Sequence, residues 1–248
     1  MSPDIKLIVF DLAGTTVNDS IDGLPLVTIA MKEAFKKHGF FVSPSVVNKY
    51  RGLEKKEAIK CILSDLRCKP NTECGYNENT GKETGYSVEF MIDTLFTDFK
   101  TALSNYLYSI DKEIPGTTTV FQALKSRNIK IAVGSGFPHS VVEYIVRRLN
   151  WSDLVDYVSS AEKEGHGRPH PAMIKAAMKS CGVVESCQVV KVGDSKFDIE
   201  EGRNANCWTV AVLTGTQSEE TLRQAKPDFV LSSVENLMDV LQEISNRA

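Results

Sequence analysis

Four short apolar runs of the sequence are each followed by residues whose side chains could do chemistry. The residues are Asp11, Ser135, Arg168 and Asp194, and glycines neighbour most of them. If the runs are parallel strands, their carboxyl ends share one edge of a sheet, which is where α/β proteins bind ligands. We therefore expect two acids, a hydroxyl and a guanidinium to converge at this edge.

The chemistry that suits this set is phosphoryl transfer. Asp11 and Asp194 offer the hard oxygen ligands that Mg²⁺ accepts beside substrate phosphate and water. Asp198 lies one helical turn beyond Asp194, so it could orient a bound water or the first carboxylate. Asp11 could also attack phosphorus, because a metal would draw negative charge away from the site. Arg168 could neutralise both the nucleophile and the transferring group.

Small groups at the same edge could hold the phosphoryl oxygens. The hydroxyl of Ser135 and the amide of Gly136 are candidates, since glycines let backbone amides approach a phosphate closely. Each element also has an ordinary explanation, because a strand-end aspartate is commonly an N-cap and Gly-Ser-Gly is commonly a turn. Their joint occurrence at one edge favours a site.

The composition limits the classes of partner that the protein is expected to bind. The 248 residues include 29 basic and 32 acidic side chains, a net charge of −3, and 42% are hydrophobic. This is typical of a globular protein and gives no general attraction to nucleic acid or to anionic membranes. Apolar runs stay well short of the roughly 20 residues that span a bilayer. With no signal-peptide pattern and no metal-type cysteine spacing, we expect a cytoplasmic protein with reduced thiols.

The order of the predicted elements indicates an α/β fold. Apolar runs alternate with helical patterns from about residue 116 onward, which predicts a Rossmann-like, doubly wound parallel sheet. The strands are expected at 6–10, 129–133, 155–159, 189–192, 209–213 and 229–231.

The stretch between the first and second strands breaks this alternation. It contains helical patterns at 26–37, from 43, at 55–65 and at 87–109, with no convincing strand. The polar stretch at 67–85 is expected to be an exposed, mobile loop. We therefore expect an α/β core at 1–19 and 114–248, interrupted by an all-helical domain at 20–113.

The combination of motifs resembles the haloacid dehalogenase superfamily of phosphotransferases. The usual first motif of that family is DxDGTxxD, whereas this chain reads Asp11-Leu-Ala-Gly-Thr-Thr-Val17, with Ala13 in place of the second acid. The third motif usually supplies a lysine, and here the sequence Gly-Arg168-Pro stands in its place. Both departures are similar to the phosphonoacetaldehyde hydrolase branch.

This resemblance implies further roles. Mg²⁺ would be held by Asp11, the Ala13 carbonyl, Asp194 and Asp198, and Arg168 would replace the usual lysine. Phosphate and substrate would contact Gly14, Thr15, Ser135, Gly136 and Phe137. The inserted helical block would be the cap domain of the family.

A cap lysine is the other feature of that branch. Its cap motif resembles MGLxK, matched here by Arg51-Gly-Leu-Glu-Lys55, so Lys55 would form a Schiff base with an aldehyde substrate and Gly52 would contact it. The carbon would then leave as an enamine, and the acid that Ala13 replaces would not be needed. The alternative is that Lys55 belongs to a solvated helix face.

The sequence differs from this branch at several positions, so substrates other than phosphonoacetaldehyde remain alternatives. The branch usually has a histidine where this chain has Ala58 and a tyrosine where it has Phe137, and Glu54 could raise the pKa of Lys55 by pairing with it. The leading expectation is a hydrolase of a small phosphonate, with a possible homodimer as the assembly. The alternatives are a phosphatase of small phosphate esters, a haloalkanoic acid dehalogenase, and a non-catalytic binding protein of the same fold.

Overall fold

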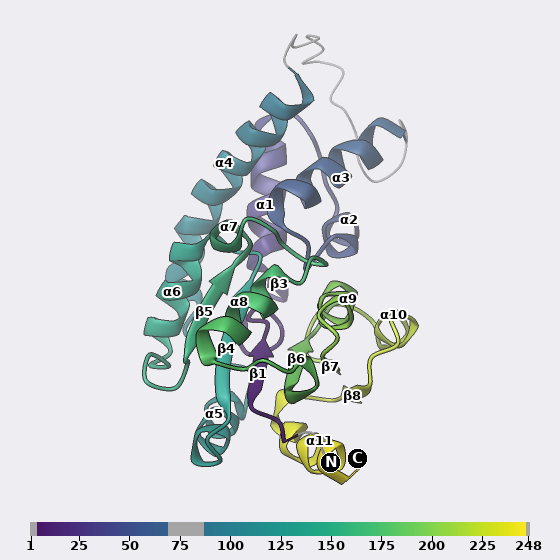
Figure 1. The fold of residues 1–248 in the computed structure, drawn as a ribbon. Coiled ribbons are helices and arrows are strands. Elements are labelled where there is room, and N and C mark those ends of the chain that lie inside the picture. Colours follow the sequence, from purple (N-terminus) through teal and green to yellow (C-terminus); the bar gives the residue numbers. More distant parts are fainter. Residues whose placement is uncertain (1–3, 69–86, 247–248) are drawn as a thin grey trace. The chain divides into compact units, whose positions relative to one another are not determined.

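The computed structural model describes residues 4–68 and 87–246. The loop expected at 67–85 therefore lies, apart from its first two positions, outside the described residues. The chain divides into two compact units (Figure 1): unit 1 comprises Met1–Asn18 and Ile110–Ala248, and unit 2 comprises Asp19–Ser109.

Within the described residues, unit 1 is built on a six-stranded sheet in which every neighbouring pair is parallel. The strands are β1 (Leu7–Phe10), β4 (Lys130–Ser135), β5 (Tyr157–Ser160), β6 (Val189–Gly193), β7 (Trp208–Val212) and β8 (Phe229–Leu231). Their order is β5-β4-β1-β6-β7-β8, which is the 3-2-1-4-5-6 order of doubly wound sheets when strands are numbered along the chain. The predicted fold class is confirmed.

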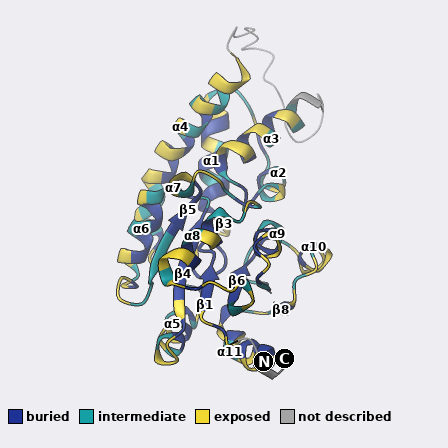
Figure 2. Cartoon of the chain, viewed as in Figure 1, coloured by how far each residue is buried: buried dark blue, intermediate teal, exposed yellow. Residues whose placement is uncertain are grey.

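Helices cover both faces of this sheet. Leu7 and Val9 of β1 pack in one cluster with Ile174 of α8 (Ala172–Cys181), whereas the ring of Phe10 lies 5.0 Å from that of Phe121 on α5 (Thr117–Ser126). Both faces of β1 and β6 are thus covered, and the two strands are buried along their length (Figure 2). The α-helices of unit 1 are α5 (Thr117–Ser126), α6 (His139–Arg148), α7 (Ala161–Glu164), α8 (Ala172–Cys181), α9 (Lys196–Asn204), α10 (Glu219–Gln224) and α11 (Leu237–Asn246), with 3₁₀ turns η3 (Ser186–Gln188) and η4 (Val234–Asn236).

Unit 2 is mainly helical. Its helices are α1 (Leu26–Lys37), α2 (Pro44–Lys49), α3 (Lys55–Cys68), α4 (Val88–Tyr106) and the 3₁₀ turn η2 (Leu107–Ser109), and α4 packs against both α1 and α3. The helix expected from Ser43-Pro44 is confirmed, because Ser43 Oγ accepts the Val46 amide 3.4 Å away and Pro44 occupies the first turn.

The prediction that residues 20–113 contain no strand was wrong. A short antiparallel hairpin joins β2 (Ser20–Ile21) to β3 (Leu24–Pro25). Its two-residue turn is Asp22-Gly23, and both residues have positive φ, of 50° and 78°. This dipeptide is a strong hairpin signal, but the strands on either side are too short to show an alternating pattern.

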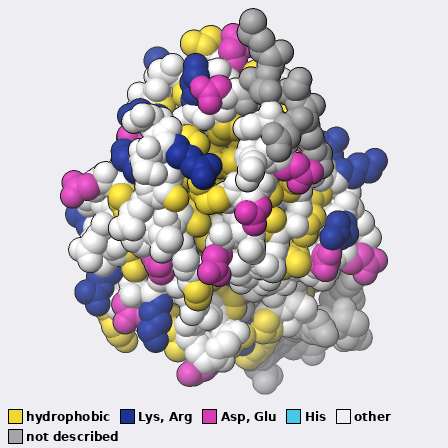
Figure 3. Space-filling model, turned by 90° about the horizontal axis from the view of Figure 1, so that it is seen from below, with side chains coloured by type: hydrophobic (Ala, Val, Ile, Leu, Met, Phe, Trp, Pro, Cys, Tyr) yellow, Lys and Arg dark blue, Asp and Glu magenta, His cyan; other side chains and the backbone are white. Residues whose placement is uncertain are grey.

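No helix in residues 4–68 and 87–246 is long and apolar enough to cross a membrane. On the face of the molecule shown in Figure 3, the basic side chains of the described residues are interspersed with acidic ones. This face therefore presents neither a strongly basic nor a strongly acidic field.

Candidate active site

A tight turn directly after β1 positions Asp11. The amides of Thr15, Thr16 and Val17 all donate to the carbonyl of Leu12, at 3.1, 2.9 and 2.8 Å. The Thr16 hydroxyl donates to the Asp11 carbonyl at 2.8 Å, which fixes the start of the turn. The Asp11 side chain is left at the carboxyl end of the central strand and is only 5% exposed.

Arg168 reaches the same point from the segment between α7 and α8. Its Nη2 lies 2.6 Å from Asp11 Oδ1 and donates to the carbonyl of Gly134 at 2.7 Å. Burial opposes the charge of Arg168, but the surrounding carboxylates outweigh burial and raise the pKa of the guanidinium. Burial also raises the pKa of Asp11, although the positive charge of Arg168 opposes this rise. The pair is thus a buried, charge-assisted contact.

Asp194 and Asp198 bring two further carboxylates to this edge from the β6–α9 junction. Oxygen atoms of Asp11, Asp194 and Asp198 lie within 4.8 Å of one another. Ser195 caps α9 and its hydroxyl donates to Asp198 Oδ2 at 2.5 Å, while Asp198 Oδ1 lies 2.9 Å from Arg168 Nε. Burial disfavours ionisation of Asp198, but Arg168 and Lys191 outweigh it and lower the pKa.

Glycines make room for these acids. A Cβ on Gly215 would lie 1.8 Å from Asp194 Oδ2, and one on Gly14 would lie 2.7 Å from the same oxygen. A Cβ on Gly193 would lie 2.2 Å from Asp198 Cγ. Gly14 also has a φ of 88°, which side-chain-bearing residues rarely adopt. The close packing of these acids therefore requires glycine, without a side chain, at three positions.

The charges of the site suit a divalent cation. Among the described residues, the buried ionisable groups that gather here are Asp11, Arg168, Lys191, Asp194, Asp198 and Glu201. Four carboxylates and two cations leave two negative charges in a buried space. Oxygen donors with this excess charge are what Mg²⁺ requires, so the residues fit the ion that the sequence implied.

The residues expected to hold phosphate lie around the same edge. Thr15 Oγ1 donates to Asp194 Oδ1 at 3.3 Å, and the buried Ser135 accepts the Phe137 amide on its hydroxyl at 3.2 Å. Ser135 ends β4, beside the end of β1, so the β4–α6 loop with Gly136 lies next to the Asp11 turn. Phe137 is buried, with 2% of its surface exposed.

Sequence reasoning missed Lys191, Glu201 and Gly215. Lys191 interrupts the apolar run of β6, and a charge inside a fully buried strand is a signal that could have been used. Glu201 lies three residues after Asp198, on the same side of α9. Gly215 follows β7 after a gap, and its role depends on a contact that spacing does not reveal.

The two remaining expected site residues, Gly52 and Lys55, belong to unit 2. Gly52 has a φ of 98° in the turn before α3, and Lys55 begins that helix with 5% exposure and donates to the Leu53 carbonyl at 3.2 Å. Glu54 Oε2 accepts the amide of Glu57 at 2.9 Å, so the Glu54 carboxylate caps the helix. Lys55 is therefore buried, unlike the solvated lysine of the alternative interpretation.

A doubly wound sheet with buried acids after its two central strands, interrupted by a mainly helical unit after the first, defines a class of α/β enzymes that work at this sheet edge. Residues 8–212 match the family model of the haloacid dehalogenase-like hydrolases. The chain belongs to this family and is an enzyme of the hydrolase type.

The chain is also similar to relatives that are named as phosphonoacetaldehyde hydrolases. It is 28% identical to a phosphonoacetaldehyde hydrolase of Bacillus cereus over 244 residues, covering 98% of this chain and 88% of the relative. A bifunctional phosphonoacetaldehyde hydrolase/aminoethylphosphonate transaminase of Clostridioides difficile is 27% identical, with 98% of this chain and 40% of the relative covered. These similarities support the predicted branch.

Solved structures agree on the fold. A phosphonoacetaldehyde hydrolase-like protein of Oleispira antarctica superposes with a TM-score of 0.85 at 23% identity, over 99% of this chain and 94% of the other. A β-phosphoglucomutase of Clostridium difficile superposes with a TM-score of 0.77 at 21% identity, over 98% of each chain.

Proposed function

We propose that the chain is an Mg²⁺-dependent phosphonatase that cleaves the carbon–phosphorus bond of a small aldehyde phosphonate, phosphonoacetaldehyde or a close analogue. Asp11 is the nucleophile, Lys55 forms a Schiff base with the aldehyde, and unit 2 is the cap. The similarity to phosphonoacetaldehyde hydrolases supports this substrate class.

The observation that carries this proposal is the alanine two residues beyond Asp11. Ala13 lies in the tight turn after β1 and is 9% exposed, so this position offers no proton to a leaving group. Cleaving an alkyl phosphate ester expels an alkoxide, which benefits from a general acid. A carbon leaving group needs an electron acceptor instead, and a cationic imine on Lys55 supplies one.

The chain's own residues account for the bond changes. Asp11 attacks phosphorus, and the carbon–phosphorus bond breaks as the aspartyl–phosphate bond forms. The released electron pair enters the imine on Lys55 to give an enamine. Protonation of the enamine and hydrolysis of the resulting imine release the free aldehyde, and a second water hydrolyses the aspartyl phosphate to inorganic phosphate.

Arg168 assists the first step. Its 2.6 Å contact with Asp11 orients the attacking carboxylate and places positive charge beside the phosphorus. Asp11, Asp194 and the Ala13 carbonyl are the groups that would hold Mg²⁺, which when bound neutralises charge on the phosphoryl group. Both oxygens of Asp198 already contact Ser195 or Arg168, which favours a role for Asp198 through a bound water. Thr15, Ser135 and Gly136 would hold phosphoryl oxygens, with Phe137 and Gly52 bordering the substrate.

Borohydride trapping tests the proposal. Borohydride added with phosphonoacetaldehyde should reduce the imine and leave a stable mass increase on the peptide that contains Lys55. Lys56→Arg is the matched control, because exposed Lys56 pairs with Asp93 at 2.6 Å and its replacement should leave the adduct in place. Phosphate release without any adduct at Lys55 would reject the imine and favour a phosphate-ester phosphatase.

A further inference from the structure

Lys191 is a charged side chain in a place where charge is costly. It sits in the middle of β6, beside Val9 of the central strand, and is 0% exposed. A buried ammonium is tolerated only when it is paired with nearby anions. The roles proposed above for Asp11, Arg168 and the metal ligands do not explain why this strand carries a lysine.

The ion-pair partners of Lys191 explain why a lysine lies in this strand. Lys191 Nζ lies 3.0 Å from Asp198 Oδ1 and 3.1 Å from Glu201 Oε2. Arg168 Nε lies 2.9 and 3.2 Å from the same two oxygens. Two cationic nitrogens and two carboxylate oxygens thus alternate around a closed four-atom ring, in which every neighbour has the opposite charge.

The ring and Asp11 contact different nitrogens of the same guanidinium. The Nε of Arg168 belongs to the ring, while its Nη2 contacts Asp11 and Gly134. A guanidinium is planar and rigid, so holding Nε also fixes the direction of Nη2. Glu201 gives Nε a second carboxylate partner besides Asp198.

We propose that Glu201 and Lys191 are positioning residues that aim the Arg168 guanidinium at Asp11. Glu201 provides the second anchor for Nε, and Lys191 allows two carboxylates to lie side by side without repelling each other. The inference rests on the proposed function, in which Arg168 serves the phosphoryl-transfer step.

The packing of α9 serves this arrangement. Gly202 follows Glu201, and a Cβ there would lie 3.0 Å from Lys191 Cβ and 2.6 Å from Thr209 Cγ2. The helix can therefore lie close against β6 and β7, which brings Glu201 down to the level of the buried lysine. The close approach of α9 to the sheet thus allows the ion pair between Lys191 and Glu201 to form.

A purely structural role makes a different prediction. Replacing a buried ion pair by uncharged groups of similar size is often neutral or stabilising. The double variant Lys191→Met/Glu201→Gln removes one cation and one anion, so it keeps the excess of two negative charges. If the pair only stabilises the fold, this variant should turn over substrate like the wild type.

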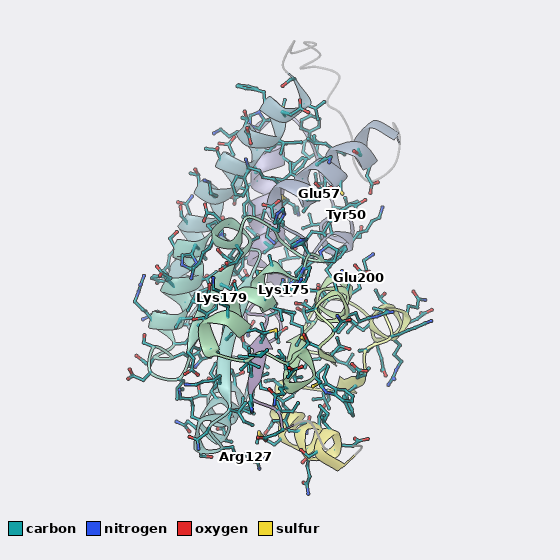
Figure 4. The ribbon with its side chains drawn as sticks, in the orientation of Figure 1. Tyr50, Glu57, Arg127, Lys175, Lys179 and Glu200 are labelled. Atoms are coloured by element: carbon teal, nitrogen blue, oxygen red, sulfur yellow. The ribbon has the colours of Figure 1, made fainter. Side chains whose placement is uncertain are left out.

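The experiment compares Glu201→Gln, the double variant and the control Glu200→Gln. Glu200 is the neighbouring glutamate on α9 (Figure 4), is partly exposed and takes no part in the ring. We expect kcat for phosphonoacetaldehyde to fall about 10- to 100-fold in both ring variants, with KM changed little. Glu200→Gln should keep wild-type values. Wild-type kcat in a folded double variant would overturn the proposal.

A second readout does not depend on activity. In ¹H–¹⁵N spectra, the Arg168 Nε–H signal is identified by its loss in Arg168→Lys. This signal should shift in Glu201→Gln and in the double variant, and should stay in place in Glu200→Gln. An unmoved signal in Glu201→Gln would reject the positioning role even if activity fell. If the wild-type enzyme does not cleave the phosphonate, the proposed function fails, whereas this spectrum still decides the geometry.

Discussion

Arg168 Nη2 lies 2.6 Å from Asp11 Oδ1, although 157 positions separate the two residues in the chain. The parallel sheet brings them together, because Asp11 follows the central strand β1 and Arg168 follows β5 at the same edge. The contact joins the proposed nucleophile to a positively charged partner. Such preorganised charge costs no rearrangement during the reaction.

Replacing Asp11, the proposed nucleophile, should stop the reaction. Asp11→Asn keeps the size of the side chain but replaces the attacking carboxylate with an amide. We expect phosphate release to fall by about 10³-fold or more, with the thermal unfolding midpoint little changed. Phosphate release from phosphonoacetaldehyde measures the effect. If Asp11→Asn still releases phosphate at a rate within about tenfold of the wild-type rate, Asp11 is not the nucleophile.

Adding an acid at position 13 should change the preferred leaving group. Ala13→Asp places a carboxylic acid two residues after Asp11, where it can protonate an alkoxide. Hydrolysis of glycerol phosphate should rise by about 10²-fold or more, which is the usual contribution of a general acid. The comparison is 4-nitrophenyl phosphate, whose leaving group needs no proton. Equal gains with both esters would show that Ala13 has another role.

Filling the space beside Asp194 should weaken metal binding. Gly215→Ala puts a methyl group 1.8 Å from the present position of Asp194 Oδ2, so the carboxylate must move. Mg²⁺ affinity measured by calorimetry should fall about 10- to 100-fold. The control is Gly182→Ala, at a positive φ with no atom within 4 Å of the added Cβ, which should cost about 1 kcal/mol of stability and leave Mg²⁺ binding intact. Unchanged affinity in Gly215→Ala would argue against metal binding by Asp194.

Asp156 should make stability depend on acidic pH. Burial disfavours its charge, but the Ile131 amide at 2.9 Å and the ammonium groups of Lys130 and Lys125 outweigh burial and lower the pKa. A lowered pKa stabilises the fold above the unfolded-state pKa near 3.9, and this contribution is lost as pH falls through the folded-state pKa.

Asp156→Asn should therefore be less stable than wild type by about 1–2 kcal/mol at pH 7, with the difference shrinking toward pH 3. Urea unfolding at both pH values measures it. The exposed Asp153 gives the control Asp153→Asn, which should track the wild type at both pH values. A difference that stays constant with pH would mean that the Asp156 charge is not the cause.

The sequence predicted which residues lie at the carboxyl edge of the sheet better than it predicted the residues that hold them in position. Asp11, Ser135 and Asp194 each follow an apolar run directly, so parallel-sheet geometry alone brings them to one edge. The helix capped by Ser43 was predicted for a local reason, because capping and proline signals act over a few residues.

The parts that were missed depend on contacts between distant residues. Lys191 pairs with Glu201 only because α9 folds back over β6, and Gly215 matters only because its backbone meets Asp194. Neither contact leaves a spacing pattern in the sequence. The β2–β3 hairpin was missed for the opposite reason, because its strands are shorter than the window in which alternation can be seen.

The chain leaves and re-enters the α/β unit at neighbouring points. The Asn18 amide donates to the Lys112 carbonyl at 3.0 Å, and the Ile114 amide donates to the Thr16 carbonyl at 2.8 Å. A short turn could therefore join these two ends without stretching the sheet. Genetic exchange of the whole segment between them would leave the buried acids of the sheet edge in place. Descendants of one scaffold could therefore acquire new substrates by replacing a single continuous stretch of gene.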